Sequence, residues 1–282
     1  MMSLKREIKC YCSAGLEKET YMKQYKAVIY GASAKGIGIA AQLPDQVLVV
    51  EKTSLAAREF AGALVMGEGR WEEKTEPGKK LTERYRQKGI LMEGRPIQIA
   101  AAAPVMFETI RDAKIQVLFG TDIKVSRTDG KHIVTCCNDS GVFQVCAEHV
   151  YDWEQEASSQ PEYGKYINAM LYCENPQQAA AWENGCGGIR VLEYAHPDMK
   201  ILCYPLHRED GWITAREKLH SFWKNRPTQL ASWKMVTVAS SFAWLKETGE
   251  DGKKLQPLYG NLLGAFESGV ELGRKWREEE CC

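Results

Sequence analysis

The chain has 282 residues, and its 37 Lys plus Arg balance its 37 Asp plus Glu, so the formal net charge is zero. A balanced charge excludes the strongly basic surface on which binding to nucleic acid or to an anionic membrane depends. No run in the sequence approaches the ~20 apolar residues of a membrane span, and residues 1–20 lack the apolar core of a signal peptide. We therefore expect a cytoplasmic protein with one large α/β domain, or such a domain and a smaller lobe.

Ten cysteines are many for this chain, which is nevertheless too long to be a disulfide-stapled miniprotein. No C-x-x-C spacing occurs, so neither a zinc knuckle nor a thioredoxin-like motif is supported, and we expect no metal. Two interpretations stay open for Cys10, Cys12, Cys281 and Cys282: a shared thiolate site, or tails that carry reduced thiols. We interpret the pair Cys136–Cys137 as structural.

The first regular pattern follows a polar lead-in over residues 1–24. Ala27–Tyr30 is a short apolar run of the kind found in buried parallel strands. A small-residue turn then leads into an apolar run over 37–43, and a second apolar run over 46–50 ends at Glu51. This order predicts a βαβ unit that binds a dinucleotide.

Each part of this unit has a physical role. Gly31 permits the tight turn, the helix N-terminus offers free N–H groups to a pyrophosphate, and Glu51 can accept hydrogen bonds from a ribose diol. Ser33 stands where the G-x-G-x-x-G pattern has its second glycine, and the crossover from Gly36 to Glu51 is short. The alternative is a plain βαβ unit whose turn holds no ligand.

Further elements are expected after Glu51. Apolar spacing predicts a helix over 55–64, an exposed loop over 67–78 and a charged helix over 80–88. A short strand or extended entry is expected over 95–99, a helix from Pro104 and a buried strand over 115–119. Three short strands over 123–126, 132–136 and 142–146 form a predicted antiparallel meander, and 149–151 is expected to return to the main sheet.

This order of elements resembles the FAD-binding domain of two-dinucleotide-fold flavoproteins, the glutathione-reductase and fumarate-reductase type of oxidoreductase. The resemblance covers residues 25–151 and 259–276. It implies that FAD is the cofactor and that its pyrophosphate lies on Gly31, Ser33 and Gly36. The resemblance also implies a ribose on Glu51 and an adenine near Ile123. The candidate cofactor-binding residues of this part of the chain are Gly31, Ala32, Ser33, Ala34, Lys35, Gly36, Glu51, Lys52 and Ile123.

The same resemblance implies that Gly264, Glu267 and Ser268 lie along the ribityl–pyrophosphate side, at the start of a C-terminal helix. Two departures from the family pattern concern this cofactor. Phe266 replaces a glycine where the backbone meets the cofactor, and Asp152-Trp153-Glu154 replaces the family's Ala-Thr-Gly.

Residues 152–235 are expected to form a substrate or cap lobe, with 25–151 and 236–282 as the discontinuous FAD domain. In the lobe we expect a helix from Asn175 through Trp182, strands over 188–194 and 199–206, a helix capped at Thr214, and a strand over 233–239. No catalytic residue is assigned; the candidates are His196, Tyr204, His207, Arg208 and His220.

The expected fold is α/β: a Rossmann-like FAD-binding βαβ sheet, a three-stranded antiparallel meander and a smaller α+β lobe. The expected function is that of an FAD-dependent oxidoreductase acting on an unidentified small molecule. One alternative is a catalytically silent flavoprotein-like subunit or scaffold, and another is a protein that binds NAD or an adenylated product. A homodimer or a partner subunit is possible in each case.

Overall fold

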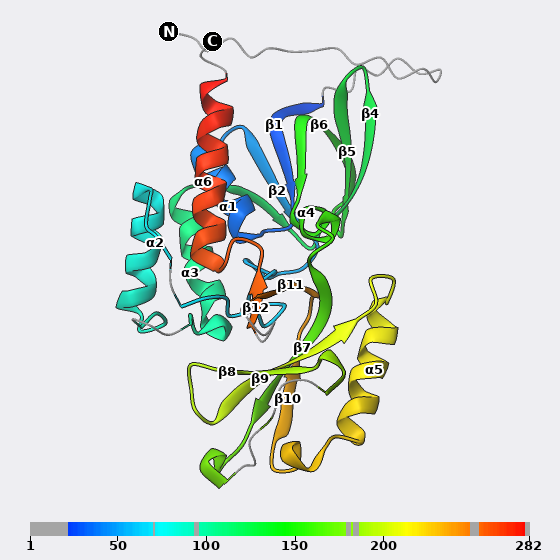
Figure 1. The fold of residues 1–282 in the computed structure, drawn as a ribbon. Helices are drawn as coiled ribbons and strands as arrows, with labels where there is room; N and C mark the ends of the chain where they lie inside the picture. The colour runs from blue at the N-terminus through cyan, green and yellow to red at the C-terminus, as the bar shows by residue number, and fades with distance from the viewer. Residues whose placement is uncertain are drawn as a thin grey trace.

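A computed structural model describes residues 22–69, 71–92, 96–178, 182, 186–248 and 254–279. The chain forms two lobes, each built on a sheet of six strands (Figure 1). The expectations for residues 1–21, with Cys10 and Cys12, and for Cys281 and Cys282 lie outside the described residues. The expected α/β fold, with a parallel Rossmann-like sheet and a separate antiparallel sheet, is confirmed.

The first sheet has the strand order β3-β2-β1-β6-β5-β4. Its parallel part consists of β1 (Lys23–Tyr30), β2 (Val47–Glu51), β3 (Gln116–Phe119) and the second half of β6 (Gly141–Asp152). The first half of β6 pairs antiparallel with β5 (Lys131–Asn138), and β5 pairs with β4 (Asp122–Thr128). The predicted meander and the predicted return strand are therefore both present, joined in one continuous strand.

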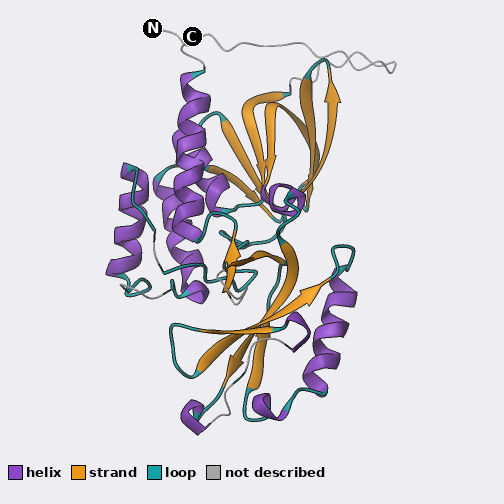
Figure 2. Ribbon diagram, in the orientation of Figure 1, coloured by secondary structure: helices purple, strands orange, loops and turns teal. Residues whose placement is uncertain are grey.

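Helices gather on one side of this sheet (Figures 1 and 2): α1 (Ala34–Gln42), α2 (Glu76–Gln87), α3 (Ala102–Asp112) and α6 (Leu262–Glu278). Helices α1 and α6 touch backbone to backbone. A Cβ atom on Gly269 would lie 2.0 Å from the carbonyl oxygen of Lys35, and one on Gly38 would lie 2.3 Å from that of Phe266. Phe266, which the sequence analysis placed where the backbone meets the cofactor, is 1% exposed and packs into the main core.

The other face of the parallel strands packs against the meander. An apolar cluster on this face joins β1 and β2 to β5, and it contains Val28, Leu48, Val50, Val134 and Cys136. Along β1 and β2, the residues of this cluster alternate with residues of the main core. Period-2 alternation of this kind places successive side chains on opposite faces of a sheet. The sheet is thus buried on both sides, which explains the continuous apolar runs that identified β1 and β2.

The second lobe surrounds β7 (Gly164–Tyr172). Its sheet has the order β12-β11-β7-β9-β8, and β10 also pairs with β7. The other strands are β8 (Arg190–Glu193), β9 (Met199–Leu206), β10 (Lys234–Val238), β11 (Ala243–Thr248) and β12 (Lys254–Pro257). One face packs under α5 (Trp212–Lys224), and the other joins the core of the first lobe. The sequence analysis grouped residues 236–238, 243–248 and 254–257 with the FAD domain, but these residues belong to β10, β11 and β12 of this second sheet.

Three expected local features differ in the structure. The segment 55–64 forms consecutive turns rather than a helix, and Ala57 and Leu64 both have φ of 53°. Residues 96–98 are irregular and lead into a short 3-10 helix, Ile99–Ala101. Helix α5 begins after Gly211, so Thr214 lies inside it. Of the helix expected over 175–182, the structure describes the 3-10 turn Pro176–Gln178 and residue 182.

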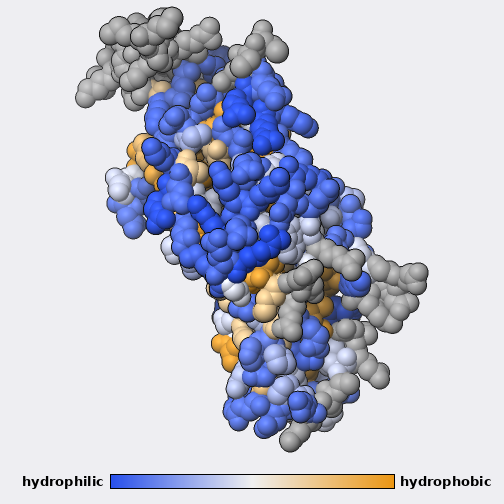
Figure 3. Space-filling model, turned by 90° about the vertical axis from the view of Figure 1, so that its left-hand side faces the viewer, coloured by the Kyte–Doolittle hydropathy of each residue, from blue (hydrophilic) through white to orange (hydrophobic). Residues whose placement is uncertain are grey.

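None of the helices in the described ranges is both long enough and apolar enough to span a membrane. On the face that Figure 3 shows, hydrophilic side chains cover most of the surface, and hydrophobic ones form separate patches, one of which lies below the middle of the molecule.

Candidate functional site

The predicted glycine turn lies at the carboxyl end of β1. Gly31 has φ of +94°, a conformation that favours glycine, and Ser33 caps α1 by accepting a hydrogen bond from the N–H of Gly36 at 3.0 Å. The first N–H groups of α1 therefore point out of the sheet edge, as in an anion-binding helix N-terminus. The strand, turn and helix expected over 27–43 are therefore present.

A side chain of the protein itself occupies that N-terminus. Oε1 of Glu59 accepts a hydrogen bond from the N–H of Ala34 at 2.5 Å. Among the described residues, Oε2 of Glu59 is buried and has no hydrogen-bond partner. Burial raises the pKa of Glu59 to about 8, and the neighbouring carboxylate of Glu51 adds to this effect. The N–H of Ala34 and the guanidinium of Arg58 act in the opposite direction but do not outweigh burial.

Glu51, the predicted ribose ligand, is also occupied by groups of the chain. Its Oε2 accepts from the N–H of Ala32 at 2.9 Å, and its Oε1 accepts from the N–H and the hydroxyl of Thr53, both at 2.7 Å. Nη1 of Arg58 lies 3.9 Å from Oε1. Because Glu51 is 0% exposed, no oxygen of its carboxylate is available at the surface.

Helix α4 (Trp153–Ser159), which the sequence analysis did not predict, covers the glycine turn. Asp152 caps this helix by accepting from the N–H groups of Glu154 and Gln155. A Cβ atom on Gly31 would lie 2.6 Å from Cδ1 of Trp153, so the indole rests directly on the turn. Nη2 of Arg58 lies 3.3 Å from Oε2 of Glu154 and ties α4 to the segment after β2.

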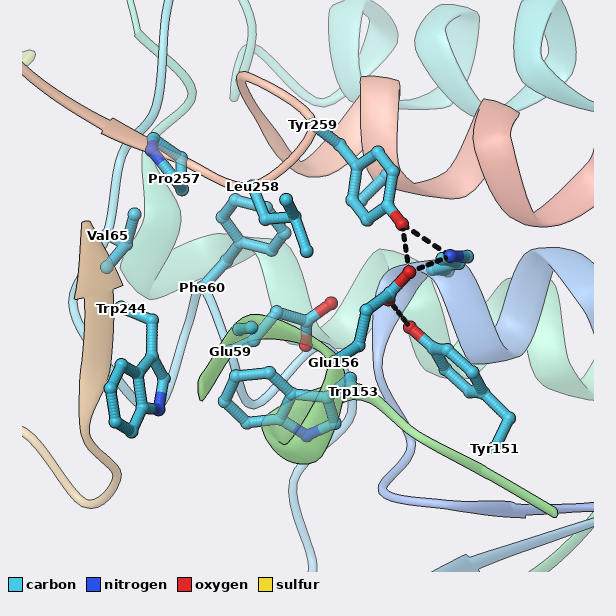
Figure 4. Close-up of a pocket in the computed structure, with 13 residues that line it drawn as sticks. Glu59, Phe60, Val65, Tyr151, Trp153, Glu156, Trp244, Pro257, Leu258 and Tyr259 are labelled. Atoms are coloured by element: carbon cyan, nitrogen blue, oxygen red, sulfur yellow. Dashed lines mark hydrogen bonds and ion pairs between the residues drawn. The ribbon is translucent and has the colours of Figure 1, made fainter. Parts of the chain in front are cut away.

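A second polar cluster joins α1, α4, the end of β6 and the turn before α6 (Figure 4). Glu156 accepts hydrogen bonds from Nζ of Lys35 at 2.6 Å, from the hydroxyl of Tyr151 at 2.6 Å and from that of Tyr259 at 2.5 Å. Nζ of Lys35 also donates a hydrogen bond to the hydroxyl of Tyr259. Burial works to raise the pKa of Glu156, but these three donors outweigh it and hold that pKa below its usual value. Burial and the adjacent Glu156 raise the pKa of Tyr151 and of Tyr259.

These side chains leave little space at the site. The cavity between Lys35, Glu59, Trp153 and Tyr259 holds about 40 Å³, and the one beside Gly31 and Glu51 holds about 10 Å³. The second volume admits about one water molecule, whereas pockets for drug-sized ligands measure about 300–1,000 Å³. FAD therefore does not fit the site in the conformation that the structure describes.

The structure brings part of the predicted set together. Gly31, Glu51 and Lys52 line the smaller cavity, and Lys35 lines the larger one. Gly264, Glu267 and Ser268 line a separate open groove of about 540 Å³ on the other side of Tyr259. Oε1 of Glu267 accepts from the backbone of Lys74 and Thr75. Ile123 lies in β4 of the meander and packs, partly buried, against the apolar cluster that contains Val28 and Val134.

The candidate catalytic residues of the second lobe do not line either cavity at the glycine turn. Arg208 donates to the carbonyl oxygens of Ser158, Gln160 and Tyr163, so it fixes the end of α4. His196 lies 3.5 Å from Asp198 at an exposed turn, and Tyr204 packs against Phe222. The expected structural role of Cys136–Cys137 stays a prediction, although Cys136 is buried and both thiols are free.

Sequence reasoning missed the residues that fill the site: Arg58, Glu59, Tyr151, Glu156 and Tyr259. One signal was present. Asp152-Trp153-Glu154 stands out as a bulky, charged replacement in a segment where the family pattern is small.

No protein-family model and no curated protein matches the chain. Solved structures do. One is p-nitrophenol 4-monooxygenase PnpA from Pseudomonas putida DLL-E4, at 10% identity and TM-score 0.54, over 91% of this chain and 80% of that one. A flavoprotein/dehydrogenase from Cytophaga hutchinsonii is 10% identical at TM-score 0.52, over 92% and 79%. The flavin-dependent halogenase CmlS is 12% identical at TM-score 0.55, over 92% and 60%.

At such identities the likeness shows the fold. The chain has the fold of flavin-dependent enzymes, with a parallel-sheet lobe and an antiparallel lobe. It spans less than two thirds of the length of the halogenase.

Proposed function

We propose that the chain is an FAD-dependent oxidoreductase that acts on a small molecule. The observation that carries the proposal is the unit β1–α1–β2, in which the glycine turn, the N-terminus of α1 and Glu51 meet at the carboxyl ends of parallel strands. Open α/β sheets bind nucleotides at this edge. The meander and the antiparallel lobe, in a fold shared with flavin-dependent enzymes, support the same assignment.

In this proposal the residues of the turn from Gly31 to Gly36 would hold the diphosphate, and Glu51 and Lys52 would hold the ribose. The role of Gly264, Glu267, Ser268 and Ile123 toward the cofactor stays a prediction, as do the two-dinucleotide family, the division into domains and a homodimer or partner subunit. FAD would supply the redox chemistry, and the residues of the chain would bind and orient it. Because the site is filled, binding requires at least Glu59 and Trp153 to move.

The second candidate function is a catalytically silent subunit or scaffold of the same fold. The filled site favours it, since Glu59, Trp153 and the partners of Glu51 satisfy the groups that a nucleotide would contact. In such a protein the fold would serve through its surfaces and its stability rather than through a bound nucleotide.

The visible absorption spectrum separates the two candidates. The protein is purified without added cofactor, and the spectrum is then repeated after incubation with FAD at pH 8.5. Flavin bands that remain with the protein after desalting and bleach with dithionite support the oxidoreductase. A protein that retains no FAD under any of these conditions, either as wild type or as Glu59→Ala, contradicts it and leaves the silent subunit.

A further inference from the structure

The proposed function leaves one disagreement with the structure, which is that the anion-binding end of α1 already holds an acid. We infer that Glu59 is an internal occupant of the diphosphate position, and that a phosphate ligand binds at α1 only when Glu59 leaves it. The inference rests on the proposed function for the identity of the natural ligand, but not for the role of Glu59.

The contact is made by a segment that is fixed at several points. The N–H of Ala57 donates to the carbonyl oxygen of Ala32 at 2.7 Å, which holds the segment against the glycine turn. The hydroxyl of Ser241, in the second lobe, donates to the carbonyl oxygen of Arg58 at 3.0 Å. The amide of Asn168 donates to the carbonyl oxygen of Ala63 at 2.8 Å. Glu59 is therefore held in the site by both lobes.

The carboxyl group meets the same helix terminus that would receive a phosphate. A helix N-terminus attracts anions through its free N–H groups and its positive dipole end, and Oε1 of Glu59 uses one of those N–H groups. A phosphate oxygen and Oε1 cannot accept from the N–H of Ala34 in the same position. Occupancy by Glu59 and occupancy by a phosphate are thus mutually exclusive.

Displacement of Glu59 is coupled to a proton. The titratable or charged groups that face its carboxyl are Glu51, Arg58, Tyr85 and Tyr151, and Lys35 and Glu156 line the same cavity. Burial among them raises the pKa of Glu59 to about 8 at this place, whereas a released glutamic acid ionises near pH 4.5. Release of Glu59 therefore releases a proton between these two values. A ligand that displaces Glu59 gains up to tenfold in affinity per pH unit over that interval.

The test uses the full chain and inorganic pyrophosphate, with binding measured by isothermal titration calorimetry at pH 6, 7 and 8. Four proteins are compared: wild type, Glu59→Ala, Glu59→Gln and the control Glu83→Ala. Glu83 lies on the exposed side of α2, and its side chain is 55% exposed. Glutamine resembles the protonated acid in shape and charge, so Glu59→Gln keeps the site filled at every pH.

We expect Glu59→Ala to bind pyrophosphate at least tenfold more tightly than wild type at pH 6. The ratio of these two affinities, in which the ionisation of pyrophosphate itself cancels, should shrink as the pH rises to 8. Glu59→Gln should bind weakly with no such change in its ratio to Glu59→Ala, and Glu83→Ala should match wild type. Equal affinities in wild type and Glu59→Ala, undetectable binding in both, or a ratio that does not change with pH overturns the inference.

Added FAD then separates the inference from the proposed function. If Glu59→Ala binds pyrophosphate with the expected ratio but retains no FAD, the inference stands and the proposed cofactor is wrong. If wild type retains FAD and Glu59→Ala changes neither ligand's affinity, the proposed function stands and the inference fails.

Discussion

Oε1 of Glu59 accepts a hydrogen bond from the backbone N–H of Ala34 at 2.5 Å. This contact occupies the N-terminus of α1, which is the feature of the βαβ unit that most strongly predicts nucleotide binding. The fold is that of flavin-dependent enzymes, whereas the site is filled by Glu59 at Ala34 and by Trp153 at Gly31.

The first prediction concerns stability and pH. The pKa of Glu59 is raised to about 8 in the folded protein, so its contribution to stability is fully present below pH 4.5 and is lost as the pH rises toward 8. The free energy of unfolding of wild type should therefore fall over this interval by up to about 1.4 kcal/mol per pH unit relative to Glu59→Gln. Urea unfolding between pH 5 and 8.5 measures the free energy of unfolding of both proteins. Parallel curves would show that the pKa of Glu59 is not raised in the folded protein.

The second prediction concerns the contact between Gly31 and Trp153. Gly31→Ala should destabilise the protein, because its φ is +94° and the new methyl group would lie 2.6 Å from the indole. Trp153→Ala alone should cost about 3–5 kcal/mol, because it leaves a cavity. In the double variant the clash is absent, so the two losses should not add, and a coupling of about 0.5–3 kcal/mol is expected. Chemical denaturation of all four proteins in this double-mutant cycle measures the coupling, and strict additivity would contradict the contact.

The strands β1 and β2 and the meander of the first lobe could be predicted from sequence because local signals agree there. The apolar runs of β1 and β2, the small residues between them and the turn Asp129-Gly130 of the meander each fix one element without help from distant residues. The prediction of a helix over 55–64 was wrong for the opposite reason. The apolar spacing of this segment suits a helix, but Ala57 bonds to Ala32 and Ser241 bonds to Arg58, so contacts remote in sequence decide its path.

The same limitation applies to the site. Sequence could indicate which N–H groups await an anion, because Gly31 and Ser33 lie beside them in the chain. It could not indicate that Glu59, 25 positions after Ala34, reaches them. Nor could it show that Gly264, Glu267 and Ser268 face a different groove, since that depends on the close packing of α6 on α1.

The third prediction concerns the ion pair between Lys35 and Glu156. Because the pKa of Glu156 is held below its usual value, its contribution to stability is present above about pH 4.5 and is lost as the pH falls through the lower folded value. Lys35→Met removes a partner at 2.6 Å, so it should cost about 1–3 kcal/mol at pH 7 and should move the onset of acid unfolding to higher pH.

The control for this variant is Lys88→Met. Lys88 pairs with Glu108 at 2.8 Å, but these side chains are 44% and 32% exposed, so the loss should be smaller than for Lys35→Met. Circular dichroism between pH 2 and 7 follows the acid unfolding of both variants. An equal shift in the two would mean that the cluster around Glu156 has no special role.

The measurement that tests the account most directly is a carbon-13 NMR titration of the Glu59 side-chain carboxyl between pH 4 and 9.5. The signal is assigned by its absence from Glu59→Gln. A carboxyl held at the N-terminus of α1 should titrate near pH 8, as its burial requires. Titration near the ordinary glutamate value of about 4.3 would contradict the account, because burial would then not outweigh the N–H of Ala34 and the guanidinium of Arg58.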